Sequence, residues 1–113
     1  MNKKQVQKHN RICLLLDYYG SLLTERKQEI LRLSYEEDMS LSEIADLLSI
    51  TRQAVHENMQ RGIEQLEEYE EKIGAAHRDI LLKRKIDSLL EDEEQNNSEK
   101  LKQDLLELQK IIL

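Results

Sequence analysis

Residues 40–61 read SLSEIADLLSITRQAVHENMQR, and this stretch decides the fold. Ser40 and Glu43 have the spacing of a capping box, in which each side chain accepts a hydrogen bond from the other residue's backbone N–H at a helix start. A short helix is therefore predicted from Leu41. It ends at a three-residue break whose last member, Thr51, is itself a good N-cap residue. A second helix is predicted to follow at once.

Two helices joined by so short a turn must cross steeply, which makes a helix-turn-helix. Ala45 supports this arrangement, because a small side chain lets the second helix approach the first. The predicted shared interior consists of Ile44, Leu48, Ile50, Val55 and Met59.

This packing leaves polar residues of the second helix facing outward, namely Arg52, Gln53, His56, Glu57 and Gln60. In a groove-binding helix-turn-helix, such residues meet base edges. Arginine and glutamine have the shapes best suited to two-pronged contacts with guanine and adenine. A polar face that is only solvated is the alternative interpretation of the same pattern, since function belongs to a site and not to a fold.

The composition indicates an all-α protein. Its 113 residues include no proline, three glycines and no phenylalanine or tryptophan, and 35% of them are charged. We predict a helix-turn-helix domain over residues 1–75 and a C-terminal helical arm over residues 76–113. The longest apolar stretches, such as residues 12–16, are too short to span a bilayer, and no signal peptide is visible. A cytoplasmic location without membrane binding is expected.

The sequence shows no pattern typical of an enzyme, a metal site or a cofactor site. Cys13 is the single cysteine and falls on an apolar helix face, which favours a packing role. His9, His56 and His77 are far apart and lack metal-ligand spacing. No glycine-rich phosphate loop or nucleophile elbow is present. We therefore expect no catalytic residue, no metal and no cofactor.

The formal charge of −6 opposes strong binding to phosphate, but the charge is unevenly distributed. Residues 1–62 hold nine Lys or Arg and nine Asp or Glu, whereas residues 63–113 hold eight and fourteen. The excess of acid lies wholly in the C-terminal half.

The N-terminal part is predicted to begin with a solvated tail. Residues 1–11 carry four basic residues and no acid, which also suits a contact with a phosphate backbone. A helix is predicted from about Asn10, and Gly20 fits the left-handed position that closes a helix. Thr24 is predicted to cap the next helix.

Beyond Arg61, an apolar line continues past Gly62 and predicts one long helix that bends near Gly74. A helix over residues 77–90 follows, and the polar run 91–97 is predicted to be a solvated acidic linker. Ser98 is predicted to cap a last helix. Its apolar stripe of Leu101, Leu105, Leu108 and Ile112 must pack on the same chain or on a partner chain. We expect the C-terminal half to build a homodimer, with a fold-back within one chain as the alternative.

The segment DYYGSLLTERKQ, residues 17–28, followed by SLSEIA and SITRQAV, closely resembles the YlxM-like family of small bacterial proteins. That family is similar in its helix-turn-helix to the fourth region of primary sigma factors. The resemblance covers roughly residues 8–75. It implies a DNA-binding regulator connected with the signal recognition particle pathway. By position it implies base contacts from the five outward residues and backbone contacts from Arg61 and the basic tail. Ser49 departs from the glycine of many such turns.

Two alternatives remain open at this stage. One is binding to the RNA of the particle, which would be read by shape or at a loop because the deep, narrow major groove of RNA resists a helix. The other is a protein-interaction adaptor that binds a component of the targeting machinery and offers its acidic arm to a basic partner.

Overall fold

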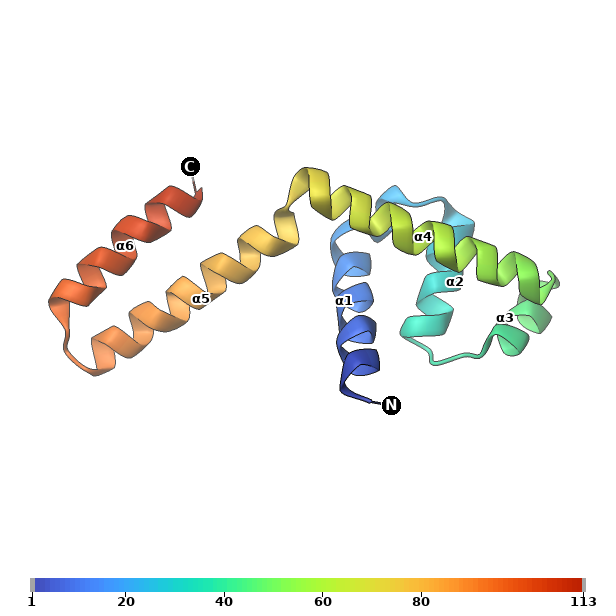
Figure 1. The fold of residues 1–113 in the computed structure, drawn as a ribbon, viewed down its shortest axis with the longest axis horizontal. Coiled ribbons are helices and arrows are strands. Elements are labelled where there is room, and N and C mark those ends of the chain that lie inside the picture. Colours follow the sequence, from blue (N-terminus) through green and yellow to red (C-terminus); the bar gives the residue numbers. More distant parts are fainter. Residues whose placement is uncertain (1, 113) are drawn as a thin grey trace. The chain divides into compact units, whose positions relative to one another are not determined.

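The computed structural model describes residues 2–112, without the side chain of Ile112, and all regular elements in this range are helical (Figure 1). The predicted all-α fold is therefore confirmed. The elements in chain order are α1 (Lys3–Tyr19), a 3₁₀ helix η1 (Gly20–Leu22), α2 (Glu25–Tyr35), α3 (Leu41–Leu48), α4 (Arg52–Ile73), α5 (Ala75–Glu94) and α6 (Ser98–Ile112).

The chain forms two compact units, one ending at Ile73 and one beginning at Gly74. Gly74 has a φ of 67°, in the left-handed region that costs a glycine little. The predicted long helix is thus present as α4, and it ends where the sequence predicts a bend.

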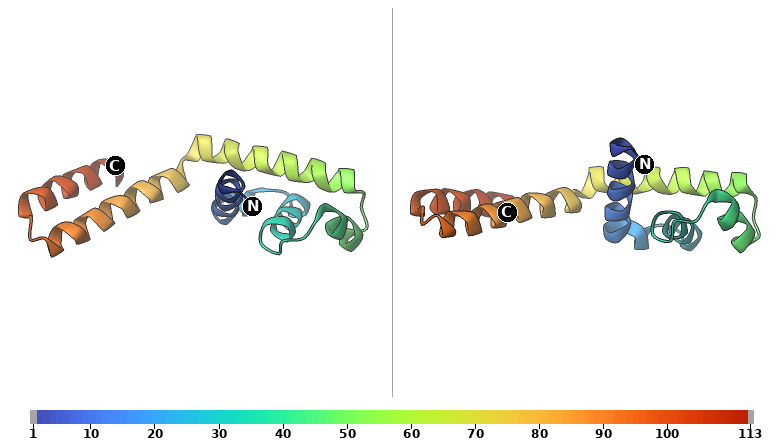
Figure 2. Two further views of the ribbon diagram at one scale, coloured as in Figure 1. Left: turned by 60° about the horizontal axis from the view of Figure 1, so that its bottom comes forward. Right: turned by 90° about the horizontal axis from the view of Figure 1, so that it is seen from below.

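In the first unit, α1, α2 and α3 all pack against α4, and α1 runs across it (Figure 2). The bidentate ion pair between Arg11 and Glu67, at 2.7 and 2.6 Å, joins α1 to the C-terminal half of α4. The Tyr19 hydroxyl donates a hydrogen bond of 2.5 Å to Glu70 one turn further on. The large apolar side chains of this unit that are fully buried are Ile12, Leu15, Leu16, Ile30, Leu31, Ile44, Val55 and Leu66.

The prediction of a solvated N-terminal tail before a helix at about Asn10 is wrong, because α1 already begins at Lys3. Asn2 and Gln5 form a capping box, with the Asn2 side chain accepting from the Gln5 N–H at 2.9 Å and the Gln5 side chain accepting from the Asn2 N–H at 3.0 Å. These two bonds satisfy the first turn, so the helix starts well before its apolar stripe.

Gly20 does not adopt the predicted left-handed conformation. Its φ of −54° is that of an ordinary right-handed turn, and it begins η1. Glycine suits this position because the space for a side chain is crowded: a Cβ at Gly20 would lie 3.0 Å from Nη2 of Arg32. Thr24 caps α2 as predicted, accepting from the Lys27 N–H at 3.3 Å.

Gly62 marks the closest approach between α2 and α4. It is buried in the middle of α4, and a Cβ at this position would lie 2.7 Å from Cδ1 of Leu31, a side chain with no exposed surface. No Cβ is tolerated so near another carbon without movement. The glycine therefore allows the two helices to pack at this distance.

The second unit is a helical hairpin in which α6 packs on α5 (Figure 1). The predicted solvated linker over residues 91–97 is wrong at its start, because α5 continues through Glu94. Asp92 is 1% exposed, since α6 covers it. The turn is confined to residues 95–97, and Asn97 rather than Ser98 caps α6 by accepting from the Lys100 N–H at 3.2 Å.

The apolar stripe of α6 is only partly used in this hairpin. Leu101 and Leu108 are half-buried, whereas Leu105 is 49% exposed, and Ile112 lies outside the described side chains. Within residues 2–112, every helix is too short or too polar to span a bilayer.

Candidate nucleic-acid interface

The turn between α3 and α4 gives the motif its sharp crossing. Ser49 has a φ of 57°, in the left-handed region, which explains why glycine is common at this place in similar turns. The N–H of Ile50 donates to the Ala45 carbonyl at 3.1 Å and closes the end of α3. Thr51 then caps α4 as predicted, accepting from the Ala54 N–H at 3.0 Å.

The start of α3 has the predicted capping box. The Ser40 side chain accepts from the Glu43 N–H, the Glu43 carboxylate accepts from the Ser40 N–H, and both distances are 3.1 Å. Both helices of the motif thus begin where the sequence predicts them.

The interior of the motif is built as the sequence predicts. Ile44 and Val55 have no exposed surface, Ala45 is 5% exposed, and Ile30 of α2 completes the cluster. Six partly buried side chains pack against it: Leu33, Met39, Leu41, Leu48, Ile50 and Met59. This core fixes the rotation of α4 about its own axis.

With α4 held in this rotation, all five predicted base-facing residues, Arg52, Gln53, His56, Glu57 and Gln60, are exposed. At 3.6 residues per turn they fall within an arc of about 140° on the first two to three turns of the helix. The Gln53 amide donates to the Glu57 carboxylate at 3.3 Å, so these two side chains form one hydrogen-bonded pair. The face therefore presents polar groups in a contiguous set.

The arginines of the first unit divide into paired and unpaired ones. Arg11, Arg26 and Arg32 each form an ion pair, with Glu67, Glu29 and Glu36. Arg52 and Arg61 form none with the described residues, and both are exposed on α4. Their guanidinium groups are the ones available to an external acceptor, such as a base edge or a phosphate.

Arg61 lies apart from the five predicted base-facing residues. It lies next to Lys27, which the sequence analysis does not identify as a site residue. Together with Lys27 of α2 it lines a surface hollow of about 380 Å³ whose other residues are Glu64, Gln65 and Glu68. Lys27 reaches this place because Gly62 brings α2 close to α4, and its Cβ would be 3.8 Å from a Cβ at Gly62. No local pattern in the sequence marks Lys27, since the proximity is tertiary.

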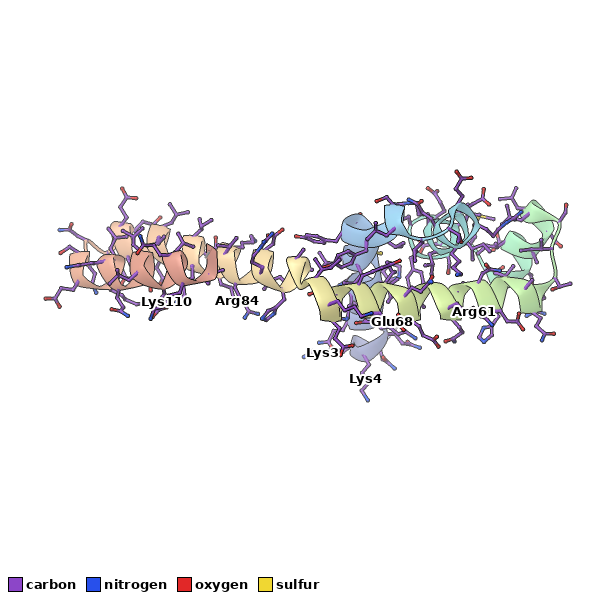
Figure 3. All side chains as sticks on the ribbon, turned by 90° about the horizontal axis from the view of Figure 1, so that it is seen from above. Lys3, Lys4, Arg61, Glu68, Arg84 and Lys110 are labelled. Carbon is purple, nitrogen blue, oxygen red and sulfur yellow. The ribbon has the colours of Figure 1, made fainter. Side chains whose placement is uncertain are left out.

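The later turns of α4 are acidic. Figure 3 shows Arg61 and Glu68 following one another along α4. Glu67 and Glu70 are bonded to α1, but Glu64, Glu68 and Glu71 are exposed without an ion pair to a described residue. These carboxylates would repel phosphate, so the turns of α4 up to Arg61 suit a nucleic acid and the turns beyond it do not.

His9 and Cys13 lie together, although no sequence pattern indicates a joint role. The Cys13 Sγ is 3.6 Å from Nε2 of His9 and 3.8 Å from the Tyr35 carbonyl. Burial, followed by the charge of Glu36, raises the pKa of the Cys13 thiol, so it remains a neutral packing group. Among the described residues, no three His, Cys, Asp or Glu side chains are grouped as a metal site requires.

Comparison with known proteins identifies a family with this motif. Residues 6–108 match the family UPF0122, described as "Putative helix-turn-helix protein, YlxM / p13 like". A UPF0122 protein of Desulforamulus reducens is 52% identical over 69 residues, which cover 61% of this chain and 59% of that protein. A UPF0122 protein of Symbiobacterium thermophilum is 56% identical over 64 residues, covering 57% of this chain and 60% of that protein.

A third relative matches over a longer range. A UPF0122 protein of Fusobacterium nucleatum is 38% identical over 95 residues, which cover 84% of this chain and 92% of that protein. The chain thus aligns with about three fifths of the first two relatives and with nearly all of the third.

Proposed function

Because the chain belongs to the UPF0122 family of helix-turn-helix proteins, we propose that it is a regulatory protein that binds DNA through the N-terminal turns of α4. The observation that carries this proposal is the pair of exposed arginines, Arg52 and Arg61, that have no ion pair with the described residues while Arg11, Arg26 and Arg32 are paired. Unpaired positive charge on the second helix of the motif favours binding to a polyanion such as DNA.

The proposed roles follow from where each side chain lies. Arg52, Gln53, His56, Glu57 and Gln60 face base edges, with Arg52 the most suitable for a bidentate contact to guanine. Arg61, which is exposed on the third turn of α4, contacts the phosphate backbone. We propose that the protein acts without catalysis in the cytoplasm and, as the family resemblance implies, takes part in the signal recognition particle pathway.

The proposal includes a homodimer assembled by the C-terminal half. Two copies of α4 would suit a DNA target with two half-sites. The exposed apolar side chains of α5 and α6 support it, because a hairpin of this size has little interior of its own.

The test is a binding assay with fragments of the organism's DNA and with the RNA of the particle, each at two salt concentrations. Arg52→Ala should weaken binding to the preferred sequence by roughly 1–3 kcal/mol and reduce discrimination between sequences. Arg61→Ala should weaken binding to all sequences similarly. It should also lower the slope of affinity against salt concentration by the amount expected for about one phosphate contact.

Lys72→Ala provides the matched control, because it removes an exposed positive charge from the last turn of the same helix. It should leave binding unchanged. A parent that binds neither DNA nor the particle's RNA would refute the nucleic-acid assignment and favour the protein-interaction adaptor. Equal binding of DNA by the parent and the Arg52→Ala variant would refute the base contact from Arg52. A preference for the particle's RNA would assign the motif to RNA instead.

A further inference from the structure

The outward side of α5 carries a short stripe of four exposed residues. Lys83, Ile86, Leu90 and Glu93 follow one another at spacings of three, four and three, which places them on one face of a helix. Ile86 is 49% exposed and Leu90 is 56% exposed. We refer to these four residues as the α5 stripe.

The α5 stripe lies away from α6. The polar contacts from α5 to α6 include Ser88, which donates to Asp104 at 2.7 Å, Lys85, which is bonded to Glu107, and Asp92, 3.6 Å from Lys100. At 100° per residue their mean direction differs from that of the stripe by about 150°. The charges toward α6 are paired, whereas Lys83 and Glu93 have no ion pair with a described residue.

The hairpin needs further burial. Among the described side chains from Gly74 onward, the apolar one that is buried is Ala76, and no leucine or isoleucine in this range is. Helices of this kind gain most of their stability from packing an apolar face. Covering Ile86 and Leu90 is therefore expected to be favourable.

The stripe is complementary to itself when it is reversed. Residues 86 and 90 are equally far from residue 88, and so are residues 83 and 93. In an antiparallel pair related by a twofold axis, residue i of one copy meets residue j of the other, and j meets i. We propose that α5 pairs with α5 of a second copy, antiparallel and centred at the level of Ser88. This deepens the homodimer of the proposed function and rests on it.

In this register each contact is of a favourable kind. Ile86 meets Leu90 of the partner subunit about 3 Å along the axis from the centre, and Lys83 meets the partner's Glu93 about 7.5 Å from it. Each pair occurs twice, so the centre is apolar and both ends carry opposite charges. Such charge pairs select register and orientation more than they add affinity.

The exposed face of α6 is less suited to a second copy. Leu105 and Leu106 line a hollow there, but the charged residues at this hollow and the adjoining one are Lys102 and Lys110. Pairing that face with itself would bring like charges together. The charge pattern therefore favours α5.

The test uses the full-length chain and two charge reversals, Lys83→Glu and Glu93→Lys. Each reversal alone sets like charges against each other twice, and should raise the dissociation constant of the dimer about tenfold or more in sedimentation equilibrium. In a mixture of the two variants, a dimer with one chain of each kind again places an acidic side chain against a basic one at both ends of the stripe. The mixture should therefore dimerise as the parent does, at equal helicity by circular dichroism.

Lys102→Glu is the matched control, with the same charge change on the exposed face of α6, and it should leave the dimer unaffected. A monomeric parent across a dilution series, a mixture that fails to restore dimers, or a dimer sensitive only to Lys102→Glu would each overturn the proposal. These measurements contain no nucleic acid. A negative result would therefore overturn the α5 pairing without deciding whether the protein binds DNA.

Discussion

Gly62→Ala should destabilise the first unit, although alanine is the better residue for a helix. The substitution favours the helical conformation by about 1 kcal/mol. Against this, the new Cβ would lie 2.7 Å from Cδ1 of Leu31, which is fully buried and cannot move into solvent. Overpacking of this kind costs about 1–3 kcal/mol. The expected net loss is about 1 kcal/mol, or roughly 4–8 °C in the melting temperature of a unit of this size.

Tyrosine fluorescence is a suitable assay, because the four tyrosines, Tyr18, Tyr19, Tyr35 and Tyr69, all lie in the first unit and the chain has no tryptophan. Thermal and urea unfolding followed in this way report that unit without the hairpin.

A double-mutant cycle with Leu31→Val isolates the close contact. Shortening Leu31 is destabilising by itself, but Gly62→Ala should be less harmful in that background, with a coupling of about 0.5 kcal/mol or more. A Gly62→Ala variant that is more stable than the parent by about 1 kcal/mol would refute the close packing of α2 on α4, since helix propensity alone would then explain the result.

Ala45→Leu should destabilise the first unit by about 1–3 kcal/mol, because the added atoms must enter the buried crossing of α3 and α4; an unchanged thermal melt would contradict this. Arg11→Met should cost only about 0.5 kcal/mol, since its ion pair with Glu67 is half exposed. The hydrogen bond from Arg11 lowers the pKa of Glu67, so this contribution is present above the ordinary glutamate pKa and is lost as pH falls through the lowered value. The free energies of unfolding of the parent and the Arg11→Met variant, measured against pH, should therefore converge at acidic pH. The hydrogen bond with Asp104, followed by burial, raises the pKa of Asp92, whose contribution is therefore lost as pH rises through that raised value. Asp92→Asn should make the helicity of the hairpin less dependent on pH in this range, and an identical pH profile would count against a raised pKa at Asp92.

The candidate face on α4 could be predicted because every signal for it is local. Ser40 and Thr51 set the starts of two helices, and Ala45 and Val55 set which side is buried. Once the start and the buried side of a helix are known, the directions of its other residues follow from 3.6 residues per turn. Exposure of the five predicted residues required no further information.

The sequence-based expectations fail where tertiary contacts decide. A polar sequence predicts a solvated Asp92, but the packing of α6 on α5 buries it. Gly62 looks like a tolerated weakness in a helix, because the sequence carries no sign that Leu31 lies against it. Lys27 escapes prediction for the same reason, since it reaches Arg61 only through that packing.

The formal charge of −6 is a poor guide to binding here, because ion pairs remove equal numbers of both signs and leave the remaining charges unevenly distributed over the surface. Arg11 is bonded to Glu67, and Lys85 is bonded to Glu107. An interface is determined by the charges that remain unpaired, and these include Arg52 on α4 and the oppositely charged ends of the α5 stripe. The two surfaces should respond differently to salt. A phosphate contact releases counterions and weakens steeply with salt, whereas an interface with an apolar centre and two exposed ion pairs weakens only slightly. Raising the salt concentration should therefore release the nucleic acid before it separates the two copies of the chain.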